Sequence, residues 1–201
     1  MCIRDRTHTD IISQIIEHES FNELMIMAFQ TSCASALDAA KNIAVDMKKI
    51  ILIEPWILGD QEVSDYIDNG IPLIKPDWSG GHLQSYWHMV RDSRLFWPWY
   101  NRTISGIIEG TPDLEEKQLD IEVTELIRSE GYWQQTIKDQ LTYPTKNCLL
   151  EIDYPILILS RESHPLKNTY VEIGKNLKNA TYLSLENNPE TWGLTVTKCI
   201  L

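Results

Sequence analysis

The stretch between positions 22 and 54 constrains the fold more than any other part of the chain. Residues 24–29 and 49–54 are two short apolar runs, as expected for buried strands of a parallel sheet. The residues between them predict a helix, because small apolar residues recur there at helical spacing: Ala36, Ala39, Ala40, Ile43 and Ala44. A strand, a helix and a strand within about 30 residues predict a βαβ unit.

The turn at residues 30–32 joins the first strand to this helix, and Ser32 stands in it. Ligands and catalytic groups collect at the carboxyl ends of parallel strands. A serine on a tight strand-to-helix turn at such a strand end is typical of a nucleophile elbow. We therefore expect Ser32 to occupy a nucleophile position.

The middle of the chain has a different character. Five of the seven tryptophans lie between positions 56 and 99, among prolines and a Gly-Gly pair. Helices are predicted at residues 61–67, 82–92, after Pro98 and at 112–130. No strand-like alternation is present in this part of the sequence, so residues 56–147 are expected to form an inserted helical cap. His82, Trp87 and Trp97 are candidates for lining a pocket beneath it.

The alternation of strands and helices resumes near the end of the chain. Strands are predicted at residues 154–160 and 180–185, with helices at 165–178 and from Pro189 onward. The expected fold class is α/β, a mostly parallel sheet flanked by helices, with residues 7–55 and 148–201 as its core. Residues 1–6 fit no pattern downstream and resemble the spurious leader of conceptually translated environmental reads, so we expect them to be non-native.

The composition narrows the classes of partner. The net charge of −11 disfavours binding to nucleic acid or to an anionic membrane, and no apolar run is long enough to span a bilayer. The four cysteines form no CxxC pair, which predicts neither a metal site nor a disulfide framework and favours the cytoplasm. We expect a small-molecule substrate and no cofactor.

The order of these elements resembles the later part of the α/β-hydrolase fold. Residues 30–34 (Gln-Thr-Ser-Cys-Ala) take the place of the family's G-x-S-x-G, with both glycines replaced, and Glu54-Pro55 ends the next strand. The resemblance implies a truncated hydrolase of a small ester, amide or carbon–halogen bond, whose first strands lie upstream. The backbone N–H of Cys33 would then be one oxyanion donor.

The family's catalytic acid and histidine are harder to locate. Glu54 matches the acid position of haloalkane dehalogenase-like relatives, whereas His164 stands where the family more often has its acid. No histidine follows His164 in the sequence, which leaves it as the candidate base, although a solvated loop histidine is the preferred interpretation of this residue. One alternative is a catalytically inactive member that keeps a lidded binding pocket. Another is thiol chemistry at Cys33, although a small buried cysteine is the preferred interpretation.

Overall fold

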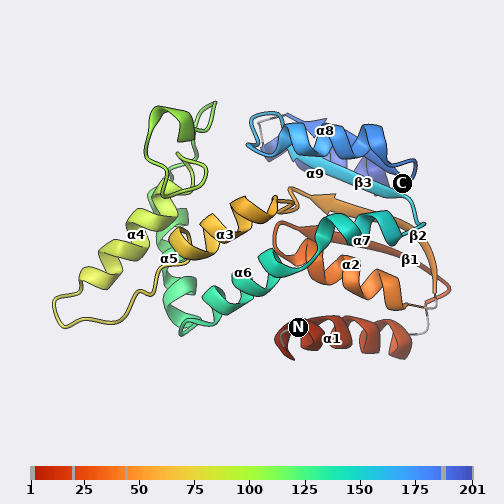
Figure 1. Cartoon of the computed structure of the whole chain (residues 1–201), viewed down its shortest axis with the longest axis horizontal. Helices are drawn as coiled ribbons and strands as arrows, with labels where there is room; N and C mark the ends of the chain where they lie inside the picture. Colours follow the sequence, from red (N-terminus) through yellow and green to blue (C-terminus); the bar gives the residue numbers. More distant parts are fainter. Residues whose placement is uncertain (1–2, 20, 44, 187–188, 201) are drawn as a thin grey trace. The chain divides into compact units, whose positions relative to one another are not determined.

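The computed structural model describes residues 3–19, 21–43, 45–186 and 189–200. Its sheet consists of strands β1 (Glu23–Phe29), β2 (Asp46–Ile53), β3 (Ile156–Arg161) and β4 (Ala180–Leu185). They lie side by side in the order β1-β2-β3-β4, and every neighbouring pair is parallel (Figure 1). The predicted α/β class with a parallel sheet is therefore confirmed.

Helices cover both faces of the sheet, because successive strand side chains point to opposite sides. Helix α2 (Ser32–Asn42) packs against β1 and β2, and α8 (Lys167–Asn176) packs against β3 and β4. Helix α9 (Pro189–Ile200) contributes side chains to an apolar cluster with strand residues Ile51, Leu159 and Leu185. These three strand residues are at most 2% exposed, so this cluster is part of the core.

Two further helices complete the layer that contains α2. Helix α1 (Ile3–Glu19) and helix α7 (Thr145–Glu151) both contact α2. Residues 3–6, expected to be a leader, form the beginning of α1, while Met1 and Cys2 lie outside the described residues. Thr9 of α1 donates a hydrogen bond from its hydroxyl to the Asp38 carboxylate of α2 at 2.8 Å, which joins the two helices.

The face of β1 that carries Met27 and Phe29 is less well covered than the rest of the sheet. Met27 is 52% exposed and Phe29 is 47% exposed, although both are large apolar residues. β1 is the first strand in the sheet order and pairs with β2 alone among the described strands. An apolar edge of this kind favours association between copies of a chain.

The chain divides into two compact units, residues 1–57 with 139–201 and residues 58–138. The second unit is helical and contains α3 (Asp60–Asn69), α4 (Gly81–Asp92), the 3-10 turn η1 (Ile104–Gly106), α5 (Glu116–Arg128) and the first part of α6 (Tyr132–Thr142). Its core is a cluster of buried side chains from α4 and α5: Tyr86, Met89, Val90, Leu119 and Val123. Across the described residues, none of the helices is both long and apolar enough to cross a membrane.

The helix predicted after Pro98 is absent from the structure of that segment. Phe96 and Ile107 instead form an antiparallel bridge, and the Trp97 N–H donates to the Gly106 carbonyl at 2.7 Å. A Cβ at Gly106 would lie 2.0 Å from the Asn101 carbonyl oxygen, so only glycine permits this close turn. The prediction was wrong because hydrophobic periodicity does not indicate backbone contacts between residues about ten positions apart, such as Phe96 and Ile107.

The helix predicted to begin at residue 112 begins instead at Glu116. The Asp113 carboxylate accepts the Glu115 N–H at 3.3 Å and thereby stabilises a local turn before the helix. Aspartate favours such turns because its short side chain reaches backbone groups two residues away.

Candidate functional site

The corner between β1 and α2 has its left-handed residue at Gln30, with φ of 48°. Its N–H donates to the Ile53 carbonyl of β2 at 2.8 Å, which fixes the corner to the sheet. Ser32 lies two residues further on and is the first residue of α2. A non-glycine residue rarely adopts this conformation, so the backbone strain of the corner resides at Gln30.

Ser32 is exposed, and both of its hydroxyl hydrogen bonds go to the backbone of Phe29. The Oγ donates to the Phe29 carbonyl at 2.7 Å and accepts from the Phe29 N–H at 3.0 Å. The N–H of Cys33, the expected oxyanion donor, donates to the Gln30 carbonyl at 3.1 Å. In this structure both groups stabilise the turn itself.

The Cys33 thiol lies beneath the corner and is 1% exposed. Its Sγ is 3.9 Å from the Ile53 carbonyl oxygen, a weak contact. Burial raises the pKa of the thiol to about 12, because an apolar environment disfavours the thiolate. Only the thiolate is a good nucleophile, so the alternative of thiol chemistry at Cys33 loses its physical basis.

Glu54 is the first residue after β2 and is fully buried, with φ of 50°. Its carboxylate forms a two-point ion pair with Arg161, at 2.6 Å from Nε to Oε1 and 2.9 Å from Nη2 to Oε2. The Arg161 backbone N–H also donates to Oε1, at 3.2 Å. A buried carboxylate is tolerated when it is paired and hydrogen-bonded in this way.

His164 is also buried, at 7% exposed, and its Nε2 lies 3.9 Å from Oε2 of Glu54. Its Nδ1 accepts the Leu166 N–H at 3.2 Å, which assigns the proton of the neutral ring to Nε2, facing Glu54. Burial lowers the pKa of His164 to about 4; the Glu54 charge opposes this shift and Arg161 adds to it. The structure thus brings together Glu54 and His164, two of the candidate site residues, and the interpretation of His164 as a solvated loop residue was wrong.

Ser32 lies on the other side of Glu54 from His164. Ser32 follows β1, Glu54 follows β2 and His164 follows β3, and β2 lies between the other two strands. Neighbouring strands are about 4.8 Å apart, so the ends of β1 and β3 are separated by about 10 Å. In the described structure, the hydrogen bonds of Ser32 involve Phe29 alone and no histidine.

Two residues of this buried cluster were missed by the sequence analysis, Arg161 and Tyr170. The Tyr170 hydroxyl donates to the Pro55 carbonyl at 2.8 Å and lies 3.3 Å from Nδ1 of His164. Arg161 is the last residue of β3, whose register places it next to the end of β2. The sequence did contain a signal for this ion pair, because Arg161 ends one apolar strand and Glu54 follows another.

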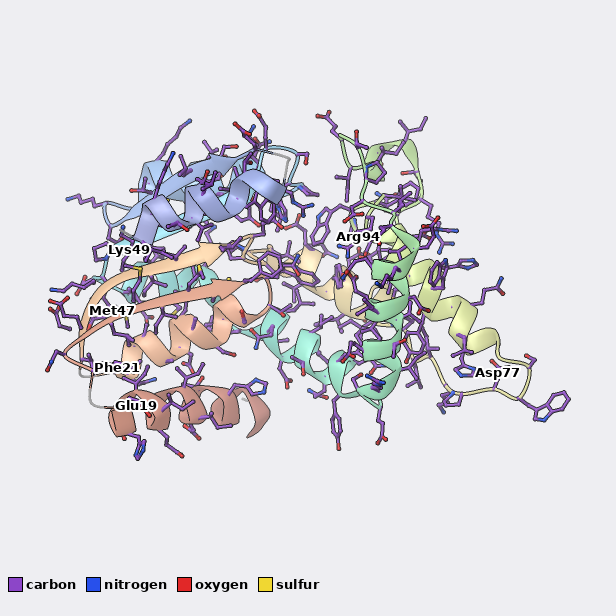
Figure 2. All side chains as sticks on the ribbon, turned by 180° about the vertical axis from the view of Figure 1, so that it is seen from behind. Glu19, Phe21, Met47, Lys49, Asp77 and Arg94 are labelled. Atoms are coloured by element: carbon purple, nitrogen blue, oxygen red, sulfur yellow. The ribbon has the colours of Figure 1, made fainter. Side chains whose placement is uncertain are left out.

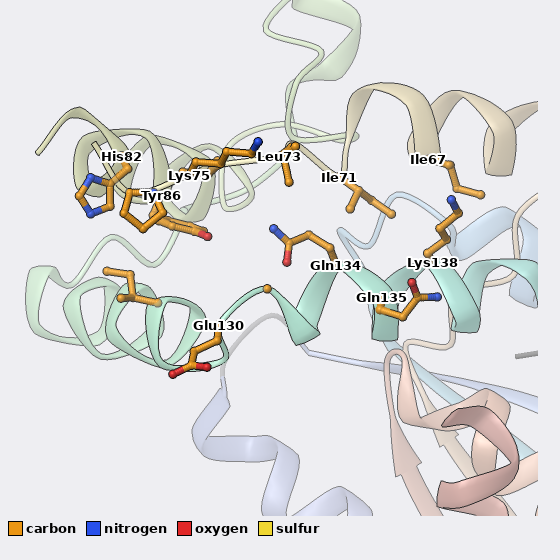
Figure 3. A pocket seen from close by; sticks show the side chains of 14 residues that line it. Ile67, Ile71, Leu73, Lys75, His82, Tyr86, Glu130, Gln134, Gln135 and Lys138 are labelled. Atoms are coloured by element: carbon orange, nitrogen blue, oxygen red, sulfur yellow. The ribbon is translucent and has the colours of Figure 1, made fainter. Parts of the chain in front are cut away.

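The helical unit of residues 58–138 contains a cleft of about 660 Å³, shown in Figure 3. Its walls come from α3, the 71–76 segment, α4, the end of α5 and α6. His82 lines this cleft. Trp87 packs against the core of the unit, and Trp97 packs on Tyr66 with ring centroids 5.8 Å apart.

The position of His82 is fixed by the loop before α4, where Asp77 lies (Figure 2). The Asp77 carboxylate accepts the backbone N–H groups of Gly81 and His82 at 3.2 and 2.7 Å, which satisfies two donors at the start of the helix. The Asp77 N–H donates in turn to Nδ1 of His82 at 3.2 Å. The hydrogen bond from Ser79, followed by that from His82, lowers the pKa of Asp77 below its usual range.

Comparison with known proteins gives similarity at the level of structure. No protein-family model matches the sequence, and no curated protein matches it. Among solved structures, a carboxylesterase of the thaumarchaeon Nitrososphaera gargenis matches with a TM-score of 0.64 at 10% identity, over 98% of this chain and 71% of that one. α/β hydrolases of Burkholderia ambifaria (TM-score 0.60, 11% identity, 96% and 70% covered) and Sphaerobacter thermophilus (0.54, 16%, 96% and 73%) match similarly.

This chain has the α/β-hydrolase fold. The resemblance predicted from residues 30–34 and the order of elements is therefore confirmed at the level of the fold. The chain spans about 70% of the length of each of these α/β-hydrolase-fold neighbours. At identities of 10–16%, the similarity establishes the fold alone.

Proposed function

We propose that this chain is a small-molecule-binding member of the α/β-hydrolase fold that does not use Ser32 as a nucleophile. The proposal rests on one observation: both hydrogen bonds of the Ser32 hydroxyl are made with the backbone of Phe29. A serine hydroxyl is a poor nucleophile at neutral pH unless a base within hydrogen-bond reach removes its proton.

The two groups that could activate Ser32 are engaged elsewhere. The Glu54 carboxylate is held by Arg161 at two points, and the acceptor nitrogen of His164 already receives the Leu166 N–H. A general base needs a free lone pair directed at the proton that it removes. The buried cluster is therefore better suited to holding the ends of β2 and β3 together than to proton transfer.

The binding half of the proposal rests on the cleft in residues 58–138. Its volume of about 660 Å³ lies within the range of about 300–1,000 Å³ that is usual for small-molecule sites. Most of its lining is apolar, with a few polar side chains, as is typical of such sites. By contrast, the cavity beside the corner, lined by Gln30 and Gln140, has a volume of about 10 Å³, enough for roughly one water molecule.

Hydrolysis of a small ester, amide or carbon–halogen bond is the second candidate function. It would use Ser32 as nucleophile, the Cys33 N–H as oxyanion donor, Glu54 as acid and His164 as base. Two observations favour it: the buried contact between Glu54 and His164 at 3.9 Å, and the structural similarity to a carboxylesterase. Catalytic hydrogen bonds often tighten only when substrate is bound, so the Ser32 hydroxyl would have to leave Phe29 at that stage.

A fluorophosphonate probe separates the two candidates, because it reacts with activated serines. We expect no labelling of the folded chain, and none of the Ser32→Ala variant, under conditions that label a carboxylesterase of the same fold completely. Ser35→Ala is the matched control, since Ser35 is on the same helix and is buried. Labelling that survives Ser35→Ala and disappears in Ser32→Ala would overturn the proposal in favour of hydrolysis.

A further inference from the structure

We infer that the cleft in residues 58–138 is a binding site for a single-chain carboxylate, such as a medium-chain fatty acid. This inference rests on the binding half of the proposed function and names its ligand class. It requires an apolar surface for the hydrocarbon chain, a cation for the carboxylate and a reason to prefer an anion over a cation. The cleft provides each of these.

The apolar surface comes from four parts of the helical unit that meet at the cleft. Its apolar side chains lie on α3, the 71–76 segment, α4 and α5: Ile67, Ile71, Leu73, Ile74, Tyr86 and Ile127. Leu73 is 76% exposed and Ile127 is 37% exposed, so apolar area remains open to water in the free protein. Covering such area contributes about 25 cal/mol per Å² and favours a hydrocarbon ligand.

The charge distribution of the unit selects the sign of the ligand's head group. Residues 58–138 contain fourteen acidic and seven basic side chains, yet the cleft is lined by two basic residues, Lys75 and Lys138, and by one acid, Glu130. Basic residues are thus enriched on the cleft in an otherwise acidic unit. An anionic head group is favoured there, whereas most of the remaining surface would repel it.

Lys75 is the cation on which the inference depends. Four of the unit's arginines are ion-paired with carboxylates, for example Arg94 with Glu122. Lys75 is exposed and forms no ion pair within the described part of the chain. In Figure 3 it extends along one wall of the cleft, and the Gln134 amide projects from α6 on another.

Gln134 provides an amide that is weakly held in the free protein. Its Nε2 donates to the Pro72 carbonyl at 3.5 Å, a long hydrogen bond, and its Oε1 is buried without a partner among the described residues. An ionised carboxylate accepts hydrogen bonds and donates none, so the Nε2 group can exchange its long bond to Pro72 for a bond to the carboxylate, whereas Oε1 gains nothing from the anion. We therefore place the head group between Lys75 and Gln134 and the hydrocarbon chain along Ile71 and Ile74.

Calorimetric titration with decanoate tests the inference, with decanol and decyltrimethylammonium as uncharged and cationic probes of the same chain length. We expect saturable binding of one decanoate and weaker binding of the other two probes. Lys75→Glu should weaken decanoate binding roughly three- to tenfold, since it removes one exposed charge pair and adds a repulsive charge. Its effect on decanol should be small.

Lys117→Glu is the matched control, because Lys117 is an exposed lysine of α5 outside the cleft. Leu73→Asp removes exposed apolar surface from the wall and should weaken both decanoate and decanol. No saturable decanoate binding, equal binding of the cationic probe, or equal loss in Lys75→Glu and Lys117→Glu would each overturn the inference. The fluorophosphonate experiment reads Ser32 alone, so failure of the non-catalytic proposal is distinguishable from failure of this one.

Discussion

The Glu54 carboxylate and the Arg161 guanidinium form a two-point ion pair where β2 and β3 end, with N–O distances of 2.6 and 2.9 Å. Glu54 is completely buried, whereas the Arg161 side chain is 39% exposed. One carboxylate is therefore removed from water and depends on a single arginine for its compensation. This asymmetry determines how each partner responds to substitution.

Arg161→Met should lower the free energy of unfolding by about 2–3 kcal/mol, because it leaves a buried charge unpaired while the lost guanidinium was itself partly hydrated. Urea denaturation measures the change. The double variant Glu54→Gln, Arg161→Met should recover more than half of the loss, since no charge remains buried. Arg128→Met, which removes an exposed pair with Glu125, is the control and should cost less than about 0.5 kcal/mol.

A full loss in the double variant, equal to that of Arg161→Met alone, would contradict this account. It would mean that Arg161 contributes through packing, for example through its contact with the Trp192 ring at 5.7 Å.

His164 should make the protein less stable in mild acid. Its pKa is lowered by burial to about 4 in the folded chain, against about 6.5 for an unperturbed histidine, so the unfolded chain binds the proton more readily. The contribution of the neutral ring is complete above pH 6.5 and is lost as the pH falls from 6.5 toward 4. Between pH 7 and pH 5 the expected loss is roughly 2 kcal/mol.

Denaturation series at these two pH values, for wild type and for His164→Asn, measure the effect. Asparagine keeps an acceptor for the Leu166 N–H and does not titrate, so its pH dependence should be smaller by that amount. The prediction would be wrong if the free energy of unfolding changed with pH to the same extent in wild type and His164→Asn.

Gln30→Gly should stabilise the chain by about 0.5–1 kcal/mol, because glycine adopts positive φ without strain. The backbone of Gln30 has φ of 48°, and its hydrogen bond from the N–H to the Ile53 carbonyl is kept in the variant. Thermal unfolding measures the shift. The neighbouring residue, Thr31, has φ of −63°, so Thr31→Gly is the control and should destabilise the chain.

Cys33 should resist alkylation in the folded chain at neutral pH, since its thiol is buried and its pKa is raised to about 12. Mass spectrometry after iodoacetamide treatment should find half-buried Cys199 modified before the buried Cys33 and Cys148. Cys33 should react only after urea unfolds the chain. Rapid modification of Cys33 in the native protein would restore the hypothesis of thiol chemistry.

The sheet was predictable because β1, β2 and β3 contain continuous apolar runs and turn residues separate the strands from the helices. Residues 180–185 were predicted as a strand and form β4 with the same bounds. The helix predicted at 82–92 is α4, which begins one residue earlier. The segment after Pro98 was mispredicted, because a bridge between Phe96 and Ile107 decides its conformation.

The candidate site was predictable only in part. Functional groups gather at the carboxyl ends of parallel strands, and Glu54 and His164 do follow neighbouring strands, but the sequence did not predict their contact. It could not show that Ser32 bonds to Phe29, nor that Arg161 neutralises Glu54, since hydrogen-bond partners depend on side-chain directions. The resemblance of residues 30–34 to a hydrolase elbow did not predict either hydrogen-bond partner, Phe29 or Arg161.

The sequence by itself determined the α/β class and the order of strands and helices, because hydrophobic periodicity and turn residues act locally. Only the tertiary structure decided which residue of the corner carries the strain, which base lies beside which acid, and where a cleft opens in residues 58–138. Those features depend on contacts between residues far apart in the chain. Gln30 illustrates the difference, since it lies in the predicted turn but its N–H is fixed by the carbonyl of Ile53 on the neighbouring strand.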